Sequence, residues 1–450
     1  MFLAQWIERL AGSALVNGTM VFLLCGLGVY LTVKTGFFQF RKAPEIIRKT
    51  FGTLWEKPEK TEKGISPFQA MTTALAGTMG VGNIAGVATA IVAGGPGAIF
   101  WMWVTGFFGM MTKYAEIFLA VKFRQKNQQG RYVGGPMYYM EKPMGKKGLA
   151  VIFSVVCIAA SLGSGNMTQV NSVATAMADT FGISPLISGI GIAVITGMVI
   201  LGGLKRIGKV TEAVIPLISV AYLAGAGMLL YLNREQLPAA FRLIFTEAFR
   251  LRAAGGGVAG YTIMQAFRFG TVRGIFTNEA GMGSAPMAHA AADCKSPRIQ
   301  AMWGIGEIFL DTILFCTVTA LVLLTAGGGT LWLSGEDGAP LTALAFESTF
   351  GPVGGVFLTL SLVFFAVATL LGWSYYGECA VVYLAGDKAG KELCLNIYRL
   401  LFLLVAVGGA VSSLKTVWLL ADLLNVVMAV PNVIAIIVLR RHVLKGIKKE

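Results

Sequence analysis

The chain has 450 residues, of which 55% are hydrophobic and 13% are charged, and it contains 57 glycines. Soluble domains carry about 25% charged residues, so this composition excludes an ordinary water-soluble protein and indicates a chain folded in lipid. The six cysteines lack paired spacing and there are two histidines. Neither a disulfide framework nor a histidine-based metal centre is therefore expected.

Eleven apolar stretches follow one another along the chain, each long enough to cross a hydrocarbon core of about 30 Å. They cover 14–33, 66–93, 97–121, 148–178, 185–203, 210–232, 255–291, 299–326, 353–385, 393–412 and 416–439. The first stretch lacks the small-residue cleavage site of a signal peptide. The pattern predicts an all-α membrane protein with about 11 transmembrane helices.

The basic residues behind the net charge of +14 are spread unevenly between the two expected sides of the membrane. With the N-terminus outside, the expected cytoplasmic segments hold 28 of the 37 lysines and arginines, and the outer segments hold six. This split satisfies the positive-inside rule. It predicts a multi-pass protein of the bacterial inner membrane with a cytoplasmic C-terminus, and it argues against a nucleic-acid partner. The arginine-containing outer segment 233–254 is expected to form an amphipathic helix on the membrane surface.

Two of the stretches are rich in glycine at mid-depth. The clusters are Gly77, Gly80, Gly82 and Gly86 in the second stretch, and Gly270, Gly274, Gly281 and Gly283 in the seventh. Glycine costs about 1 kcal/mol against alanine within a helix, so we expect both helices to be discontinuous. For any single glycine, a role in close helix packing stays open.

The two glycine-rich stretches occupy corresponding positions, since each opens a set of five after the first stretch is set aside. Because each set has an odd number of spans, the second set has the opposite orientation in the membrane. This is typical of inverted repeats around a midplane site. The expected organisation is an extra N-terminal helix (1–33), a basic cytoplasmic loop (34–65), a first repeat (66–232), the outer segment (233–254), a second repeat (255–440) and a tail (441–450).

The run GGPGAIFWMWVTGFFG at 94–109 resembles the signature of the alanine or glycine:cation symporter family, also called the sodium:alanine symporters. Further blocks at 78–91, 112–124, 134–140, 165–174 and 274–292 are similar to the family and follow its order. The resemblance implies the five-plus-five fold of sodium-coupled amino-acid transporters with one extra helix. It also implies import of alanine or glycine with Na⁺ and without an organic cofactor.

The resemblance further implies a sodium site. Residues 80–83 (Gly-Val-Gly-Asn) match the Gly-x-Gly-Asn of the first broken helix in the wider fold. By this likeness, Na⁺ would be bound by the backbone carbonyls near Ala76 and Met79, the carbonyl of Ala366 and the hydroxyl of Thr369. Neutral oxygen ligands of this kind suit a hard cation.

For the substrate, the likeness places the carboxylate at the opened backbone from Thr78 to Asn83 and the amino group at Gln169. The residues expected to bind the substrate are Thr78, Met79, Gly80, Gly82, Asn83, Gly165, Gln169, Phe269, Phe276, Asn278, Thr369 and Trp373. Many relatives read Thr-Val-Gly-Thr-Gly-Asn where this chain has Met79 and Val81. These departures leave the exact amino acid open.

Further polar residues lie within the stretches. Glu307 and Asp311 are four apart, on one helix face, and are expected to partner Arg268 or Arg273, with proton coupling as the alternative.

Two more pairings and one hydrogen-bonding role are expected. Lys113 should pair with Glu116 on its own helix, and Glu279 with Arg273. His289 is expected to be a hydrogen-bonding residue.

Other functions remain as alternatives. A proton-coupled transporter, or one with a broader range that includes serine and glutamine, stays open. A channel is disfavoured because a pseudo-repeated core suits alternating access. An enzyme is disfavoured because no nucleophile elbow or HExxH motif is visible.

Overall fold

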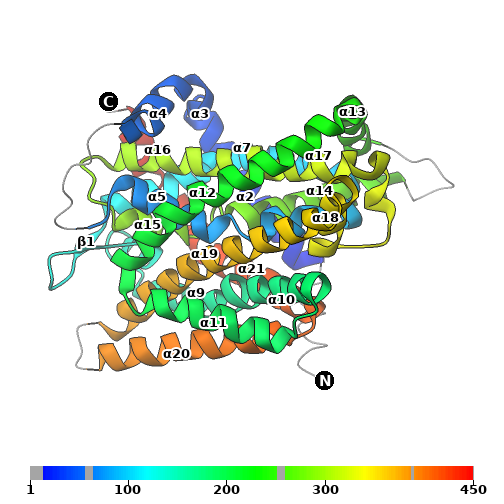
Figure 1. Cartoon of the computed structure of the whole chain (residues 1–450). Coiled ribbons are helices and arrows are strands. Elements are labelled where there is room, and N and C mark those ends of the chain that lie inside the picture. The colour runs from blue at the N-terminus through cyan, green and yellow to red at the C-terminus, as the bar shows by residue number, and fades with distance from the viewer. Residues whose placement is uncertain (1–13, 56–63, 251–258, 387–389, 449–450) are drawn as a thin grey trace.

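The computed structural model describes residues 14–55, 64–250, 259–386 and 390–448. Nearly all elements are helices, and one short antiparallel hairpin is formed by β1 (Gln125–Lys126) and β2 (Tyr132–Val133). Figure 1 shows the long helices running across the molecule side by side, with the connecting segments gathered at its two ends.

The first half of the chain forms helices that vary widely in length. They are α2 (Ala14–Lys34), α3 (Phe38–Arg41), α4 (Ala43–Lys49), η1 (Phe51–Trp55), α5 (Pro67–Thr78), η2 (Val81–Asn83), α6 (Ala85–Gly94), α7 (Ala98–Lys122), α8 (Pro136–Glu141), α9 (Lys147–Leu162), η3 (Gly163–Met167), α10 (Thr168–Phe181), α11 (Pro185–Ile200), α12 (Gly203–Leu232), η4 (Arg234–Gln236) and α13 (Leu237–Ala248). Here η3 is π-helical and joins α9 to α10 without a break.

The second half continues in the same way. Its helices are α14 (Ala259–Asn278), α15 (Ala285–Ala290), α16 (Pro297–Ile308), η5 (Phe309–Cys316), α17 (Thr317–Thr325), η6 (Ala326–Gly329), η7 (Leu331–Leu333), α18 (Gly338–Phe350), α19 (Pro352–Ala385), α20 (Lys391–Ala410) and α21 (Leu414–Lys448). A second π-helical segment, η5, joins α16 to α17.

Each of the expected apolar stretches coincides with a helix or an interrupted helix. In the described part of the chain, seven are long and apolar enough to cross a membrane: Ala98–Lys122, Lys147–Phe181, Gly203–Leu232, Pro297–Gly329, Pro352–Ala385, Lys391–Ala410 and Leu414–Lys448. The second and seventh stretches are not among these seven, and each is divided in two, α5 from α6 and α14 from α15. The predicted discontinuous helices are therefore present.

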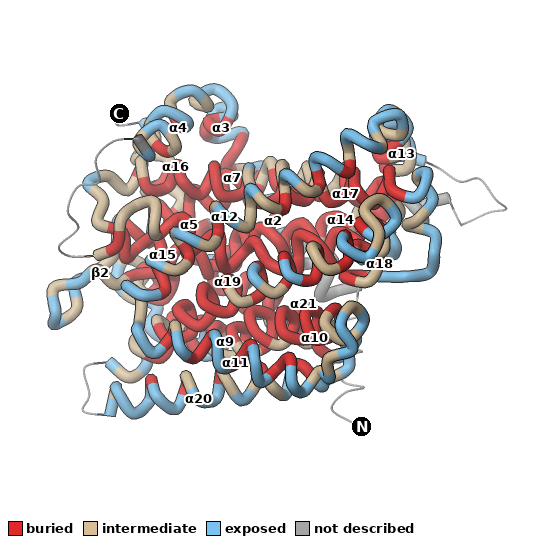
Figure 2. Tube along the Cα trace, viewed as in Figure 1, coloured by how far each residue is buried: buried red, intermediate tan, exposed pale blue. Residues whose placement is uncertain are grey.

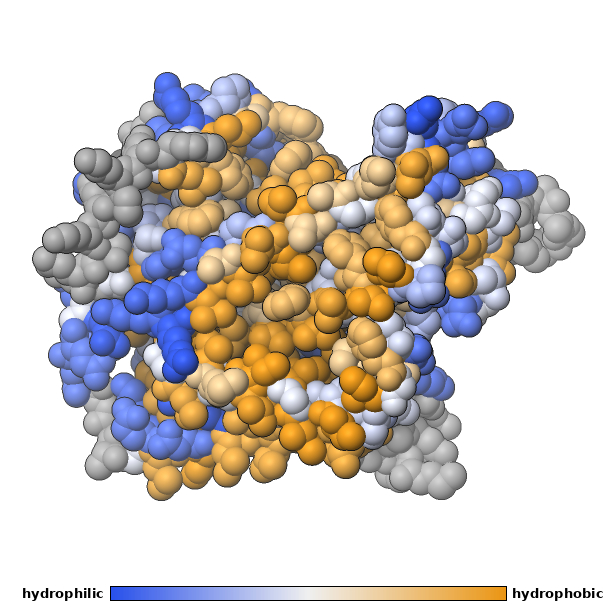
Figure 3. Space-filling view, viewed as in Figure 1, coloured by the Kyte–Doolittle hydropathy of each residue, from blue (hydrophilic) through white to orange (hydrophobic). Residues whose placement is uncertain are grey.

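The surface shows the band expected of a membrane protein. In Figure 3 a broad hydrophobic area crosses the middle of the molecule, and hydrophilic residues gather toward its two ends. Much of this area belongs to the outward faces of α11 and α20, which Figure 2 shows as exposed. The exposed side chains there include Leu186, Ile187, Ile190, Val194, Leu393, Ile397, Leu400 and Leu404. Lipid tails can cover such a face without the cost of exposing it to water.

The outer segment 233–254 contains the helix α13, and residues 251–254 lie outside the described residues. Phe241 and Phe245 are exposed on this helix, whereas Ala240 and Ile244 are buried. The segment therefore has two distinct faces, and its position on the membrane surface stays a prediction.

The short helix α5 and the long helix α19 cross almost backbone to backbone. A Cβ atom added to Gly372 of α19 would lie 2.8 Å from the backbone nitrogen of Gly77 in α5. This close crossing brings the middle of α19 against the end of α5, where the chain leaves its helical path. The crossing thereby positions the candidate site.

Candidate functional site

The first break lies between α5 and α6. The backbone leaves the helix at Met79 (φ −76°, ψ 84°) and is extended at Gly80 (φ −133°, ψ −151°), after which the short turn η2 leads into α6. Residues 79–84 are all buried. The freed peptide groups therefore need partners inside the protein.

Two amide side chains supply these partners. The Asn83 Oδ1 accepts from the Gly80 N–H at 3.1 Å, and the Gln169 Oε1 on α10 accepts from the Val81 N–H at 3.0 Å. Both are neutral groups. The break is thus held open by hydrogen bonds that a carboxylate ligand can replace with equivalent ones.

Oxygen atoms from three helices converge around Gly80. The Thr369 hydroxyl on α19 lies 3.4 Å from the Met79 carbonyl oxygen. A Cβ atom on Gly80 would lie 2.5 Å from Thr369 Oγ1 and 2.7 Å from Gln169 Oε1. Such a set of neutral oxygens fits a hard monovalent cation.

The other two expected sodium ligands flank this cluster. Ala76 and Ala366 are both fully buried, and each precedes its partner in the cluster, Met79 or Thr369, by three residues, about one helical turn. Thr78, also expected at the site, is buried, and its hydroxyl donates to the Leu75 carbonyl at 3.2 Å. That bond directs the Thr78 hydroxyl back along its own helix.

Trp373 joins the two breaks. Its Nε1 donates to the Gly77 carbonyl at 3.2 Å and to Glu279 Oε1 at 2.9 Å. Its ring fills the space in front of Gly165, where an added Cβ would lie 2.2 Å from Trp373 Cγ. Gly165 lies in the π-helical η3. The small residue there makes room for the indole of Trp373.

The second break, between α14 and α15, has a different backbone. Glu279 (φ 52°), Gly281 (φ 87°) and Gly283 (φ 83°) all adopt left-handed conformations. Ser284 donates a short hydrogen bond to Glu279 Oε2, and Asn278 Oδ1 accepts from the Ala280 N–H at 3.0 Å. Asn278 therefore caps its own break, as Asn83 does.

Of the two expected phenylalanines, Phe276 meets the first break and Phe269 does not. A Cβ on Gly82 would lie 3.2 Å from Phe276 Cδ1. Phe269 packs instead against Gly94 at the far end of α6, where an added Cβ would lie 2.9 Å from Phe269 Cβ.

The structure corrects the expected partners of the buried acids on α16 and η5. Glu307 forms an ion pair with Lys113 at 3.1 Å, and Asp311 Oδ1 accepts from Asn83 Nδ2 at 2.7 Å. Arg273 pairs with Asp422 at 3.1 Å. The expected pairing of Glu307 and Asp311 with the α14 arginines is wrong because it was inferred without knowing which helices are neighbours.

Two further pairings are also corrected. Lys113 pairs across to Glu307, while Glu116 accepts from Asn432 Nδ2 at 2.9 Å. Glu279 bonds to Trp373 and Ser284 rather than to Arg273, because Trp373 on α19 reaches into the break.

His289 is fully buried and forms hydrogen bonds, as expected. Its Nδ1 lies 2.8 Å from Gln300 Nε2, and its Nε2 lies 3.2 Å from Glu307 Oε2.

Residues of α21 were missed by the sequence reasoning. The Arg273 guanidinium lies 4.4 Å from the ring centre of Trp418, and this ring lies 5.0 Å from that of Phe276. Together with the ion pair to Asp422, these rings close one side of the first break. The available signal was an aspartate within the apolar stretch 416–439.

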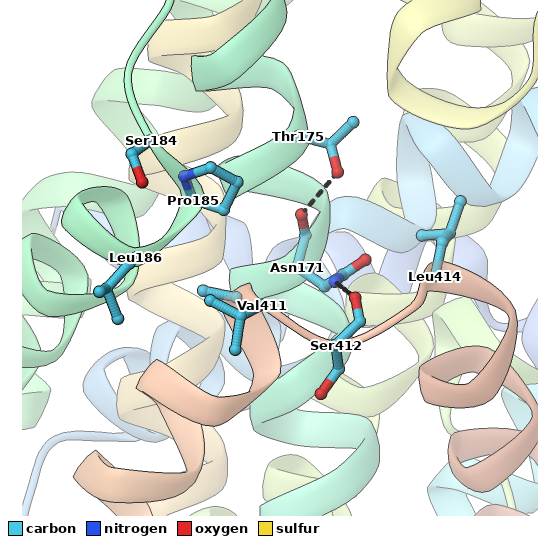
Figure 4. A pocket seen from close by; sticks show the side chains of 9 residues that line it. Asn171, Thr175, Ser184, Pro185, Leu186, Val411, Ser412 and Leu414 are labelled. Carbon is cyan, nitrogen blue, oxygen red and sulfur yellow. Dashed lines mark hydrogen bonds between the residues drawn. The ribbon is translucent and has the colours of Figure 1, made fainter.

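A cavity of about 320 Å³ lies between α10–α11 and the junction of α20 with α21. Figure 4 shows Asn171 at its centre, and the Asn171 Nδ2 donates to the Ser412 carbonyl at 2.7 Å. None of the residues expected at the site lines this cavity.

Comparison with known proteins places the chain in a family. Residues 1–449 match the sodium:alanine symporter family. The chain belongs to this family. It is 47% identical over 425 residues to the sodium/alanine symporter AgcS of Methanococcus maripaludis, covering 93% of this chain and 91% of that protein. It is 36% identical to the probable sodium/glutamine symporter GlnT of Bacillus subtilis, covering 99% and 91%.

The fold is shared with solved transporters. A crystal structure of MhsT in complex with L-phenylalanine superposes with a TM-score of 0.58 at 15% identity, covering 84% of this chain and 90% of that one. The protein is therefore an all-α membrane transporter of the sodium:alanine symporter family, and not an enzyme.

Proposed function

We propose that this protein is a secondary active symporter that imports alanine or glycine together with Na⁺ across the bacterial inner membrane. The family and the relative from Methanococcus maripaludis, a sodium/alanine symporter, support sodium and alanine. The transport cycle would be alternating access, with the inverted repeats at 66–232 and 255–440 rocking against each other. The N-terminus would lie outside and the C-terminus in the cytoplasm.

One observation carries the proposal: three neutral oxygen atoms from three helices meet at Gly80. They are the Met79 carbonyl, the Thr369 hydroxyl and the Gln169 carboxamide oxygen. A Na⁺ bound there would bridge α5 and α19 and add a positive charge beside the open N–H groups that lead into α6. An amino-acid carboxylate at these N–H groups would then be attracted both by the ion and by the helix N-terminus.

This arrangement gives a physical basis for coupling. Without Na⁺, the substrate carboxylate would be buried beside neutral groups, which costs free energy. With Na⁺ bound, the same carboxylate gains an opposite charge nearby. Each ligand therefore raises the affinity for the other by the same factor, as thermodynamic linkage requires.

The side chains packed around the first break favour a small substrate. Phe276, Trp373 and Gln169 are packed against the break with close contacts at Gly82, Gly165 and Gly80. Glutamine is the second candidate because a relative carries that substrate in its name. Its longer side chain would require these packed side chains to move.

The test is uptake into proteoliposomes that contain the purified protein. An inward Na⁺ gradient should concentrate radiolabelled alanine or glycine, whereas a K⁺ gradient or a pH gradient alone should not. A mutant with Gln169→Ala at equal reconstituted amounts should lose most of this uptake. Uptake that a pH gradient drives in the absence of Na⁺ would contradict the proposed coupling, and preference for glutamine would contradict the proposed substrate.

A further inference from the structure

Asp311 is a fully buried carboxylate that lies next to the first break and bonds to its Asn83. It lies in the π-helical η5, a type of segment that is frequent at functional sites. Asn83 Nδ2 donates both to the backbone carbonyl of Asp311 at 3.1 Å and to its Oδ1 at 2.7 Å. Thr312 Oγ1 lies 2.8 Å from Asp311 Oδ2. Every hydrogen-bond partner of this carboxylate in the described chain is therefore a neutral group.

The charged groups that act on Asp311 come from two elements. Lys113 on α7 and Glu307, one turn earlier on α16, are the charged groups, and Cys316 on η5 is a further titratable one. From η2 the facing group is the neutral Asn83, and Thr277 of α14 bonds to Cys316. The Lys113 ammonium is held by Glu307 at 3.1 Å. Asp311 has no cation of its own among the described residues.

His289 belongs to a different hydrogen-bonded group from Asp311. Its Nδ1 lies 2.8 Å from Gln300 Nε2, and its Nε2 lies 3.2 Å from Glu307 Oε2. The Gln300 amide nitrogen also donates to the Pro67 carbonyl at 3.4 Å. The hydrogen-bond partners of His289 are therefore Gln300 and Glu307, whereas those of Asp311 are Asn83 and Thr312.

The buried region around Asp311 holds more acids than ammonium groups. Glu116, Glu279, Glu307 and Asp311 are all buried, and they share the Lys113 ammonium. No three His, Cys, Asp or Glu side chains in the described chain converge to hold a metal ion. An ionised carboxylate in a low-dielectric interior without a cation is strongly disfavoured, and a bound proton removes this cost.

We propose that Asp311 holds a proton while the sodium site is empty and releases it when Na⁺ binds, so that H⁺ and Na⁺ compete at the first break. The linkage runs through Asn83, which bonds to Asp311 through its Nδ2 and to the Gly80 N–H through its Oδ1. Na⁺ at Gly80 brings a positive charge close to Asp311 and favours its ionised form. The inference rests on the proposed sodium site.

The hydrogen bonds assign the proton to one oxygen. Asn83 Nδ2 is a donor and cannot accept, so Oδ1 stays an acceptor in both states. The Thr312 hydroxyl can rotate to accept instead of donate, so the proton resides on Oδ2 and is shared with Thr312 Oγ1. On Na⁺ binding the O–H bond breaks, its electron pair stays on Oδ2, and the proton leaves to water. One positive charge enters and one leaves the buried region.

The first test uses the wild-type protein in weakly buffered detergent solution. Addition of Na⁺ should release protons, detected with a pH indicator dye, and addition of K⁺ should not. Proteoliposome uptake supplies the second readout. Below the pH at which Asp311 titrates, the Na⁺ concentration needed for half-maximal alanine uptake should rise by up to about tenfold for each unit by which the pH is lowered.

Two variants locate the effect. Asp311→Asn removes the titratable group and should make the Na⁺ dependence of uptake nearly independent of pH. Glu116→Gln is the matched control, because it neutralises another buried acid that bonds to an asparagine, and it should retain the pH dependence. Thermal melting of both proteins checks that they are folded.

The outcomes separate the two proposals. Na⁺-driven uptake with no proton release, and with a Na⁺ dependence that ignores pH in the wild type, would overturn the role of Asp311 alone. A pH dependence that survives Asp311→Asn or disappears in Glu116→Gln would also overturn it. Alanine uptake that never responds to Na⁺ would instead overturn the proposed function.

Discussion

The two helix breaks of this transporter are built differently although they occupy corresponding positions. The first is lined by neutral groups that reach it from other helices, among them Gln169 and Thr369, and the Asp311 carboxylate lies behind Asn83. The second carries a buried carboxylate, Glu279, and three left-handed residues. Neutral lining lets ligands enter and leave without exposing an unpaired buried charge. We infer that the first break exchanges ligands and that the second is a fixed joint.

The glycines of the two breaks serve different needs. Gly80 has an extended backbone that any residue can adopt, so glycine is required there for space. Gly281 has a positive φ and its added Cβ would also lie 2.2 Å from Leu24 Cδ2 of α2. The extra N-terminal helix therefore packs against the second break and braces it.

The largest expected effect is that of Gly80→Ala. The new methyl would displace the Thr369 hydroxyl and the Gln169 carboxamide, so Na⁺-driven alanine uptake should fall at least about 1,000-fold, which corresponds to about 4 kcal/mol. Thermal stability should change little by comparison. Uptake into proteoliposomes and melting in detergent measure the two quantities.

Gly86→Ala, in α6 just after the first break, is the control. The nearest atom to an added Cβ there is Trp418 Cη2 at 3.9 Å, so uptake should stay close to that of the wild type. Equal loss of uptake in Gly80→Ala and Gly86→Ala would show that any methyl group added near the first break abolishes transport. That result would contradict the specific need for space at Gly80.

A substitution at the second break should lower the stability of the protein. Gly281→Ala strains a left-handed residue and collides with Leu24, which together should destabilise the protein by about 3 kcal/mol. Adding Leu24→Ala should relieve the collision and restore part of the lost melting temperature. A Gly281→Ala protein that melts like the wild type but fails to bind alanine would contradict the structural role.

The link between the two breaks is tested by Trp373→Phe. The change removes the hydrogen bonds to the Gly77 carbonyl and to Glu279, leaving a buried acceptor without its donor, at a cost of about 2 kcal/mol. Both melting temperature and uptake should fall. If uptake falls and melting does not, Trp373 acts on the substrate alone and the two breaks are not joined through it.

Much of the fold was predictable because lipid forces backbone groups to be satisfied within helices. The apolar stretches therefore mark the helices, and the glycine clusters mark where Gly80 and Gly281 interrupt them. The proposed sodium ligands Met79 and Thr369 came from family resemblance, since nothing in their spacing brings α5 and α19 together.

The buried charges were not predictable. Lys113 and Glu116 are three apart on one helix, yet Lys113 turns to Glu307 on α16. Such partners depend on how neighbouring helices are rotated and tilted, and spacing within one helix carries no information on that. The same holds for Asp422 and Arg273, which meet across α21 and α14.

The most direct test of the neutral first break as the sodium site compares Thr369→Ala with Thr369→Ser. Serine keeps the hydroxyl that faces the Met79 carbonyl, and alanine removes it. The Na⁺ concentration for half-maximal alanine uptake should rise about tenfold in Thr369→Ala, equivalent to about 1.4 kcal/mol, and stay near the wild-type value in Thr369→Ser. The same Na⁺ dependence in all three proteins would contradict the account.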